Sequence, residues 1–281
     1  MKILKALRLP LVVSILGYDY EMVVVKSGLG PGYYEKLFDF ATAFTVGGPS
    51  GVKKLIEMGC PKEKIHIISL AVDPEQISFE KGKKRNDKLK LLQIATITDK
   101  KGYLTTLNAY KLAKKHYPNI TLTIIGEPLD PILVETMEEF IVSNHLTDVK
   151  LDFEIKSYKE LNSIFQMHDV FIHPSKTPPS KDRETAPVIM MDAQLAGLPV
   201  LSTFHADIPE IVLHGKTGFL VEEEDFEALS DSIVKFLKME EIEFQSFRKN
   251  ARNHIETNFN AKDKALELYN LYGKIVKQNE I

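Results

Sequence analysis

The feature that most constrains this chain is a regular alternation of apolar runs and amphipathic segments between residues 88 and 238. The apolar runs, which predict strands, occupy residues 88–97, 120–126, 149–153, 169–175 and 198–203. The amphipathic segments, which predict helices, occupy residues 102–116, 130–145, 157–168, 187–196 and 225–238. Strands that alternate with helices of roughly ten or more residues form βαβ units and a parallel sheet. The predicted fold class is therefore α/β, with ligands outside the carboxyl ends of the strands.

The N-terminal part follows this pattern less fully. Its predicted strands and helices lie at residues 11–16 and 64–72, and at 32–44 and 48–59, respectively. A core of fewer than ~80 residues is marginal by itself. Residues 79–88, with the sequence FEKGKKRNDK, are polar and charged and predict a linker. The part before the linker is therefore expected to pack against the rest of the chain or to be part of a larger domain.

Charge and cysteine content exclude several classes of protein. The 36 basic and 39 acidic residues leave a net charge of −3, and no basic stripe with interleaved aromatics predicts a nucleic-acid partner. The single cysteine, Cys60, cannot form a disulfide framework, which fits a reducing compartment. The apolar run at residues 9–16 is shorter than the ~20 residues of a spanning helix. We therefore expect a cytoplasmic protein. Its basic start is interpreted as a solvated helix face, and the alternative is a contact with the inner face of a membrane.

A loop and a short helix near residue 190 carry two carboxylates. Pro187 is predicted at the first helical position and Gly197 just past the helix end. The unpaired amides of a first helical turn favour a phosphate. Glu184, in the loop, is then placed to meet a sugar, and Asp192 to accept hydrogen bonds from a ribose diol. The alternative is that both are solvated surface acids, as most carboxylates are.

Several motifs together resemble a known family. Glu184 is followed after seven residues by Asp192 and then by AQLAGLPVLSTFHADIPEIVLHGKTGFLV. This stretch resembles the donor-binding signature of the retaining family-four glycosyltransferases. The segments GCPKEKIHIISLAVD, DKKGYLTTLNAY, LTIIGE and DVFIHPS resemble other motifs of that family and occur in the same order. The resemblance implies the GT-B architecture, in which two Rossmann-like domains face each other across a cleft.

The resemblance also implies a division of the chain. Residues 1–78 correspond to a partial N-terminal domain on the acceptor side, and residues 79–88 to the linker. Residues 89–259 correspond to a nearly complete C-terminal domain that binds the nucleotide sugar. Residues 260–281 correspond to a helix that is expected to pack back on the N-terminal domain.

Roles for individual residues follow from the same resemblance. Glu184 would contact the donor sugar, Asp192 the ribose, and Lys101, in the KKG motif, the diphosphate. Glu184 and Lys101 are thus the expected catalytic residues, and a cation beside the leaving phosphate is sensible chemistry. The amides for the phosphate would come from the turn Thr185, Ala186 and Pro187. Backbone groups around residues 154–156 would recognise the base. The chain has no Asp-x-Asp motif, and neither a metal nor a cofactor is expected.

The sequence departs from the family pattern in four ways. The opening half of the first domain is absent from this sequence. Leu16 stands where the family has a histidine at the reaction centre. Thr96, expected at the donor site, stands where an arginine partners the phosphate lysine, so one cation is missing. Asp192 replaces a glutamate and is shorter by one bond, ~1.5 Å. His173, at the end of a strand, is interpreted as structural in preference to catalytic.

The predicted function is transfer of a sugar, with retention, from a nucleotide-diphosphate sugar to a polysaccharide or glycolipid acceptor. The expected partners are the nucleotide sugar, a glycan or lipid-linked acceptor, and a separately encoded N-terminal domain or a membrane surface. One alternative is a non-catalytic nucleotide-sugar-binding remnant or a partner subunit of a transferase. A second alternative, an NAD-dependent enzyme, is disfavoured because no G-x-G-x-x-G turn follows residues 88–97.

Overall fold

The larger of two parallel sheets contains six strands. The computed structural model describes residues 9–24, 28, 30–82 and 88–279. The strands are β4 (Leu89–Ile94), β5 (Ile120–Ile125), β6 (Val149–Asp152), β7 (Val170–Ile172), β8 (Val200–Thr203) and β9 (Gly218–Val221). Their order is β6-β5-β4-β7-β8-β9, and all neighbouring pairs are parallel. This is the doubly wound order whose crossovers change direction between β4 and β7, the point where such sheets bind ligands.

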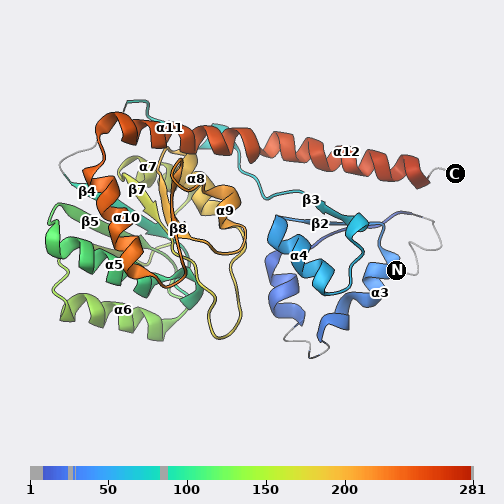
Figure 1. Ribbon diagram of the computed structural model, residues 1–281, viewed down its shortest axis with the longest axis horizontal. Helices are drawn as coiled ribbons and strands as arrows, with labels where there is room; N and C mark the ends of the chain where they lie inside the picture. The colour runs from blue at the N-terminus through green and yellow to red at the C-terminus, as the bar shows by residue number, and fades with distance from the viewer. Residues whose placement is uncertain (1–8, 25–27, 29, 83–87, 280–281) are drawn as a thin grey trace.

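Helices cover both faces of this sheet, so its strands are apolar on both sides (Figure 1). One face packs against α5 (Tyr103–His116), α6 (Pro131–Ser143) and α10 (Phe226–Lys238). The other packs against α7 (Tyr158–Gln166), α8 (Val188–Leu195), α9 (Ile208–Ile211) and α11 (Glu241–Asn258). We call residues 89–259 the six-stranded unit.

Helix caps explain several of these boundaries. The Ser157 hydroxyl accepts a hydrogen bond from the Glu160 amide, and the Glu160 carboxylate accepts one from the Ser157 amide. This reciprocal pair is a capping box, so the predicted cap of α7 is confirmed. The prediction for α8 was wrong by one residue, because Pro187 is the N-cap, with extended ψ of 109°, and the helix begins at Val188. Gly197 ends the helix with a φ of +83°, as a residue without Cβ allows. Strand β9 was not predicted, since four residues without alternation give little signal.

The smaller sheet has three parallel strands, β1 (Val12–Ser14), β2 (Ala43–Val46) and β3 (Ile65–Ile67), in the order β1-β2-β3. Two helices, α3 (Glu35–Phe40) and α4 (Pro49–Glu57), pack on one face through a small apolar cluster. We call residues 9–78 the three-stranded unit. Short helical turns lie at Asp19–Val23, Gly30–Tyr34, Lys62–Lys64, Pro74–Gln76 and Asp99–Lys101.

The prediction of one helix over residues 32–44 was wrong. The helix ends at Phe40, and the central strand β2 begins three residues later at Ala43. All four residues of β2 are buried, because both of its edges are paired and both of its faces are covered. Burial on both faces removes the alternation that would have identified a strand, and apolar residues then fit a helical pattern equally well.

The last helix, α12 (Ala261–Asn279), runs along the three-stranded unit (Figure 1). Leu271 and Ile275 pack with Ala43 on the face of the small sheet opposite α3 and α4. The two segments that pass between the units pair with each other, since the Val72 amide donates to the Phe259 carbonyl at 3.0 Å and the Ala261 amide to the Val72 carbonyl at 2.9 Å. Among the described helices, none has the length and apolar character needed to cross a bilayer. The basic start at residues 1–8 lies outside the described residues.

Candidate functional site

A cavity of about 530 Å³ opens at the carboxyl edge of the six-stranded sheet. Its walls come from the ends of β4 and β5, from residues 154–156, and from Glu184 and residues 186–189. The cavity therefore lies beside the crossover point between β4 and β7, where the topology predicts a ligand. The residues that were expected to recognise a base, 154–156, form one wall of it.

Lys101 is held in this cavity by the turn that follows β4. Its carbonyl accepts from the Gln93 side chain at 2.9 Å. The next residue, Gly102, has a φ of +68°, and a Cβ there would lie 1.9 Å from the Pro174 carbonyl oxygen. Only glycine fits this turn, which fixes the direction in which Lys101 leaves the sheet.

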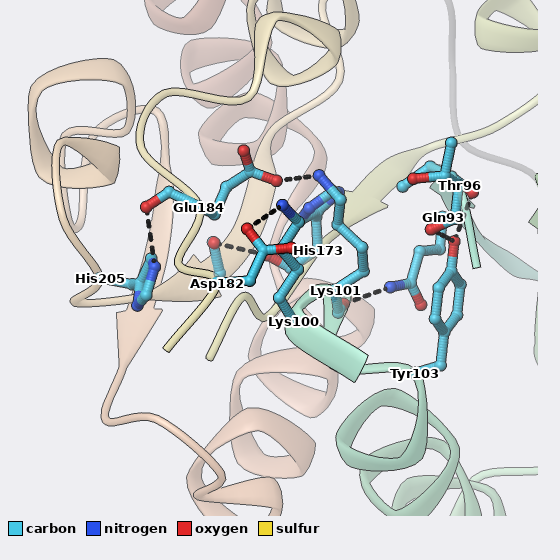
Figure 2. Close-up of polar contacts among 11 residues, drawn as sticks. Gln93, Thr96, Lys100, Lys101, Tyr103, His173, Asp182, Glu184 and His205 are labelled. Carbon is cyan, nitrogen blue, oxygen red and sulfur yellow. Dashed lines mark hydrogen bonds and ion pairs between the residues drawn. The ribbon is translucent and has the colours of Figure 1, made fainter. Parts of the chain in front are cut away.

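The Lys101 ammonium and the Glu184 carboxylate form an ion pair inside the cavity (Figure 2). Their side chains are 13% and 15% exposed, respectively, so both charges are largely withdrawn from water. Burial, and to a smaller degree Lys100, lowers the pKa of Lys101 to about 8, while Asp182 acts in the opposite direction. A second pair, Lys100 with Asp182 at 2.9 Å, joins the same two segments. The site thus offers a partly desolvated cation to an incoming anion.

His205 fixes the backbone of the loop that carries Glu184. Its Nε2 lies 3.1 Å from the Glu184 carbonyl oxygen, and its Nδ1 lies 2.6 Å from a Glu223 carboxylate oxygen (Figure 2 shows the first contact). A carbonyl and an ionised carboxylate only accept hydrogen bonds, so each contact requires a proton on the ring nitrogen that makes it. The Glu223 carboxylate also accepts from the Thr177 amide at 2.7 Å. The buried His205 ring therefore connects the Glu184 loop to the residues that follow β9.

The predicted phosphate turn divides between two surfaces. Ala186 and Pro187 line the cavity, as does Thr96 at the end of β4. Thr185 instead faces the three-stranded unit, where a Cβ on Gly17 would come within 2.5 Å of its methyl group. Within the described part of the chain, the amides of Thr185 and Ala186 donate to no other residue. These two amides are therefore candidates to bind a ligand.

Asp192 is not among the residues that line the cavity. It is 4% exposed on α8, and its carboxylate accepts from the Tyr158 hydroxyl at 2.6 Å. Burial raises the pKa of Asp192, and the bond from Tyr158 opposes that shift. The ribose role of Asp192 stays a prediction. Sequence reasoning missed Tyr158, although its place at the first turn of the helix after β6 puts it at the same edge of the sheet.

His173 lies beneath the Lys101 pair and is fully buried. Neither ring nitrogen has a hydrogen-bond partner among the residues that the structure describes. Burial, followed by the charges of Lys101 and His205, lowers the pKa of His173 well below its usual value. A neutral His173 ring adds no positive charge to the site. Leu16, on the loop after β1, is 53% exposed.

No described group of three or more His, Cys, Asp or Glu side chains is arranged to hold a metal ion. Two features of this site suit an anion, the Lys101 ammonium and the backbone amides of residues 185 and 186. Both lie at the crossover edge of a doubly wound sheet, the arrangement that suits a phosphate-containing ligand.

Comparison with known proteins identifies a family whose model matches this chain. The family model described as "Glycosyl transferases group 1" matches residues 74–254. The amylovoran biosynthesis glycosyltransferase AmsK of Erwinia amylovora is 32% identical over 207 residues, which are 74% of this chain and 50% of AmsK. The putative colanic acid biosynthesis glycosyltransferase WcaL of Escherichia coli is 33% identical over 208 residues, with the same shares. The chain spans about half the length of these relatives.

Solved structures agree on the fold. HepE of Anabaena, crystallised in complex with UDP, superimposes with a TM-score of 0.82 at 18% identity, covering 96% of this chain and 74% of HepE. A second HepE crystal structure holds UDP and glucose and gives a TM-score of 0.77 at 17% identity, covering 96% of this chain and 73% of HepE. The predicted α/β fold class of the GT-B type, with one nearly complete and one partial Rossmann-like domain, is thereby confirmed.

Proposed function

The chain belongs to the group 1 glycosyl transferases, and we propose that it transfers a sugar, with retention, from a nucleotide-diphosphate sugar to a polysaccharide or glycolipid acceptor. The observation that carries the proposal is the Lys101–Glu184 pair inside a cavity at the crossover point, next to open backbone amides. A cation and amides suit the diphosphate, and a carboxylate suits the hydroxyl groups of the sugar.

We propose that the parts of such a donor lie in the cavity in the order that the sequence predicts. The diphosphate would lie against Lys101 and the amides of Thr185 and Ala186. The sugar would lie toward Glu184, and the base against residues 154–156. Asp192 would meet the ribose only if its carboxylate shares its bond from Tyr158 with a hydroxyl of the ligand.

In the proposed reaction, negative charge develops on the departing phosphate, next to the Lys101 ammonium. The bond between the sugar C1 and the phosphate oxygen breaks, and the acceptor oxygen bonds to C1 on the same face. The acceptor proton passes to the departing phosphate. Lys101 and the two amides would stabilise the negative charge that develops on that phosphate, an effect worth several kcal/mol in a water-poor site. We propose that no metal or cofactor takes part.

The relatives support the choice of substrates. AmsK and WcaL are named for the biosynthesis of amylovoran and colanic acid, and HepE binds UDP and glucose. We therefore propose a UDP-type donor, a surface-polysaccharide or lipid-linked acceptor, and a reaction in the cytoplasm at the inner face of the membrane. The free, buried thiol of Cys60 agrees with a reducing compartment. We also propose a separately encoded N-terminal domain as a partner.

A second function is favoured by specific residues. The three-stranded unit is small, Leu16 cannot hydrogen-bond through its side chain, and Thr96 supplies no charge. These features fit a non-catalytic protein that binds a nucleotide sugar and works with a partner subunit. An NAD-dependent enzyme lacks support, because the turn after β4 has no G-x-G-x-x-G motif.

Titration calorimetry with UDP, GDP, ADP and NAD separates these functions. We expect binding of one nucleoside diphosphate and no binding of NAD. A transfer assay with the matching radiolabelled sugar nucleotide and a membrane extract then separates the transferase from the binding protein. Binding without transfer, even after addition of a separately encoded N-terminal domain, would support the binding protein. Absence of nucleotide binding would reject both.

A further inference from the structure

Asp207 connects the two units through a buried carboxylate. It lies between β8 and α9 in the six-stranded unit and is 3% exposed. One carboxylate oxygen accepts from the Ser50 amide at 2.8 Å, and the other accepts from the Ser50 hydroxyl at 2.6 Å. Ser50 lies in the first turn of α4, in the three-stranded unit. Figure 1 shows α9 on the side of the six-stranded unit that faces α4.

The start of α4 is built to receive this carboxylate. The N-cap is Gly48, which has no side chain to satisfy the first amides of the helix. A Cβ on Gly48 would lie 2.5 Å from the Asp207 carboxylate carbon, so glycine makes the approach possible. Asp207 thus replaces the missing cap from outside the unit, and its charge faces the positive end of the helix.

The backbone around Asp207 also holds the candidate donor loop. The Asp207 amide donates to the Thr185 carbonyl at 3.2 Å. Two residues earlier, the His205 ring bonds the Glu184 carbonyl. Residues 205–207 therefore contact both the loop that carries Glu184 and, in the other unit, the first turn of α4.

A rotation of one unit on the other would turn about the point where the two connecting segments pair. The two connecting segments pair at Val72 and Asn260, where each segment passes from one unit to the other. Opening about this pair would leave the crossing hydrogen bonds intact and would separate Asp207 from Ser50. Gly17 and Thr185 would separate in the same motion.

We propose that Asp207 is a positioning residue that latches the three-stranded unit over the donor loop and makes the latch sensitive to a diphosphate on that loop. The evidence for the latch is the set of contacts described above. Its role in catalysis, which is to hold the acceptor-side unit against the donor loop, rests on the proposed function. A bound diphosphate would order residues 184–186, hold the Thr185 carbonyl against the Asp207 amide, and so steady the carboxylate on α4.

Hydrogen exchange of the Ser50 amide measures the latch directly, without any need for activity. In Asp207→Ala we expect this amide to exchange about tenfold faster, with an increase in the radius of gyration by small-angle scattering. The matched control is Asp225→Ala, which removes an aspartate that caps α10 within one unit by accepting from the Ala228 amide at 2.9 Å. The control should speed exchange at α10 and leave the radius of gyration unchanged.

Two further variants separate a latch from a loss of stability. Asp207→Asn keeps an oxygen for the Ser50 amide and turns an NH₂ group toward its hydroxyl, so it should restore most of the protection. Gly48→Ala keeps both partners but drives them apart, so it should open the units as Asp207→Ala does. If Asp207→Ala and Asp225→Ala differ only at their own helices, with no change in the radius of gyration, the latch is rejected.

The link to the donor loop has its own readout. UDP, or whichever nucleoside diphosphate binds, should slow exchange at Ser50 about threefold in the natural chain and not at all in Asp207→Ala. In a transfer assay, Asp207→Ala should lower kcat while the KM for the donor changes little. Equal slowing in both proteins would overturn the coupling. Failure of every nucleotide to bind would refute the proposed function and the coupling, while exchange without ligand would still decide whether the latch exists.

Discussion

The two units of this molecule differ in how they complete their cores. The six-stranded unit covers both faces of its sheet with helices from its own continuous stretch of chain. The three-stranded unit covers one face with α3 and α4 and takes the cover of its other face from α12, at the far end of the sequence. The larger unit therefore contains the whole candidate cavity, whereas the smaller unit depends on α12 for its packing and on the Asp207 contact with the larger unit for its orientation.

Loss of the α12 cover should produce the largest effect. We expect Leu271→Ala with Ile275→Ala to destabilise the three-stranded unit by about 4 kcal/mol, since each buried side chain contributes about 2 kcal/mol or more. Hydrogen exchange at β2 reports the loss, and nucleoside diphosphate binding should persist. The control is Leu266→Ala on the same helix, because Leu266 is 57% exposed. Unchanged protection of β2 would show that the smaller unit is self-sufficient.

The diphosphate contact is the next largest expected effect. Lys101→Ala should weaken nucleoside diphosphate binding by ~2 kcal/mol, the value of a hydrogen bond to a charged group, and leave nucleoside binding nearly unchanged. Titration calorimetry with both ligands tests this. Lys100→Ala is the control, since Lys100 pairs with Asp182 and does not line the cavity. An unaltered diphosphate affinity would remove Lys101 from the site and leave the larger unit without its main cation.

The depressed pKa of Lys101 gives a smaller effect that depends on pH. The charged form binds the diphosphate, and this form is lost as the pH rises through about 8. Affinity should therefore fall up to about tenfold between pH 7.5 and 9.5, with proton uptake on binding near pH 8. Calorimetry in buffers of different ionisation enthalpy measures both. Lys101→Arg stays charged throughout and should flatten the profile; a profile that remains as steep would assign the titration to another group.

The smallest effect concerns the sugar. Glu184→Ala should cost a sugar nucleotide about fivefold in affinity, near 1 kcal/mol for one hydrogen bond. It should not weaken the free nucleoside diphosphate, because it removes the carboxylate that competes for Lys101. Competition binding with the two ligands gives the ratio. Equal losses for both would contradict a sugar contact and would assign Glu184 to the support of its loop.

The strands and helices of residues 88–203 were predictable because each has its own period and clear punctuation. Strand β2 was hidden by burial on both faces, and Pro187 lies one position earlier than the rule for helix starts suggests. Lys101 and Glu184 were placed at one sheet edge by topology and by resemblance, although they are 83 positions apart. The contacts of Asp192 with Tyr158 and of Asp207 with Ser50 were not predicted. Such pairs depend on how elements from distant parts of the chain meet, which no local pattern encodes.

The position of α12 sets an order of events during synthesis. The strands β1, β2 and β3 leave the ribosome before the six-stranded unit, yet the helix that covers their second face is made after that unit. The six-stranded unit can complete its core in the interval, since domains fold as units from the N-terminal side. We therefore expect nascent chains that are stalled before Ala261 to show a protected six-stranded unit and a protease-sensitive β2. The three-stranded unit is translated before the six-stranded unit but finishes folding after it.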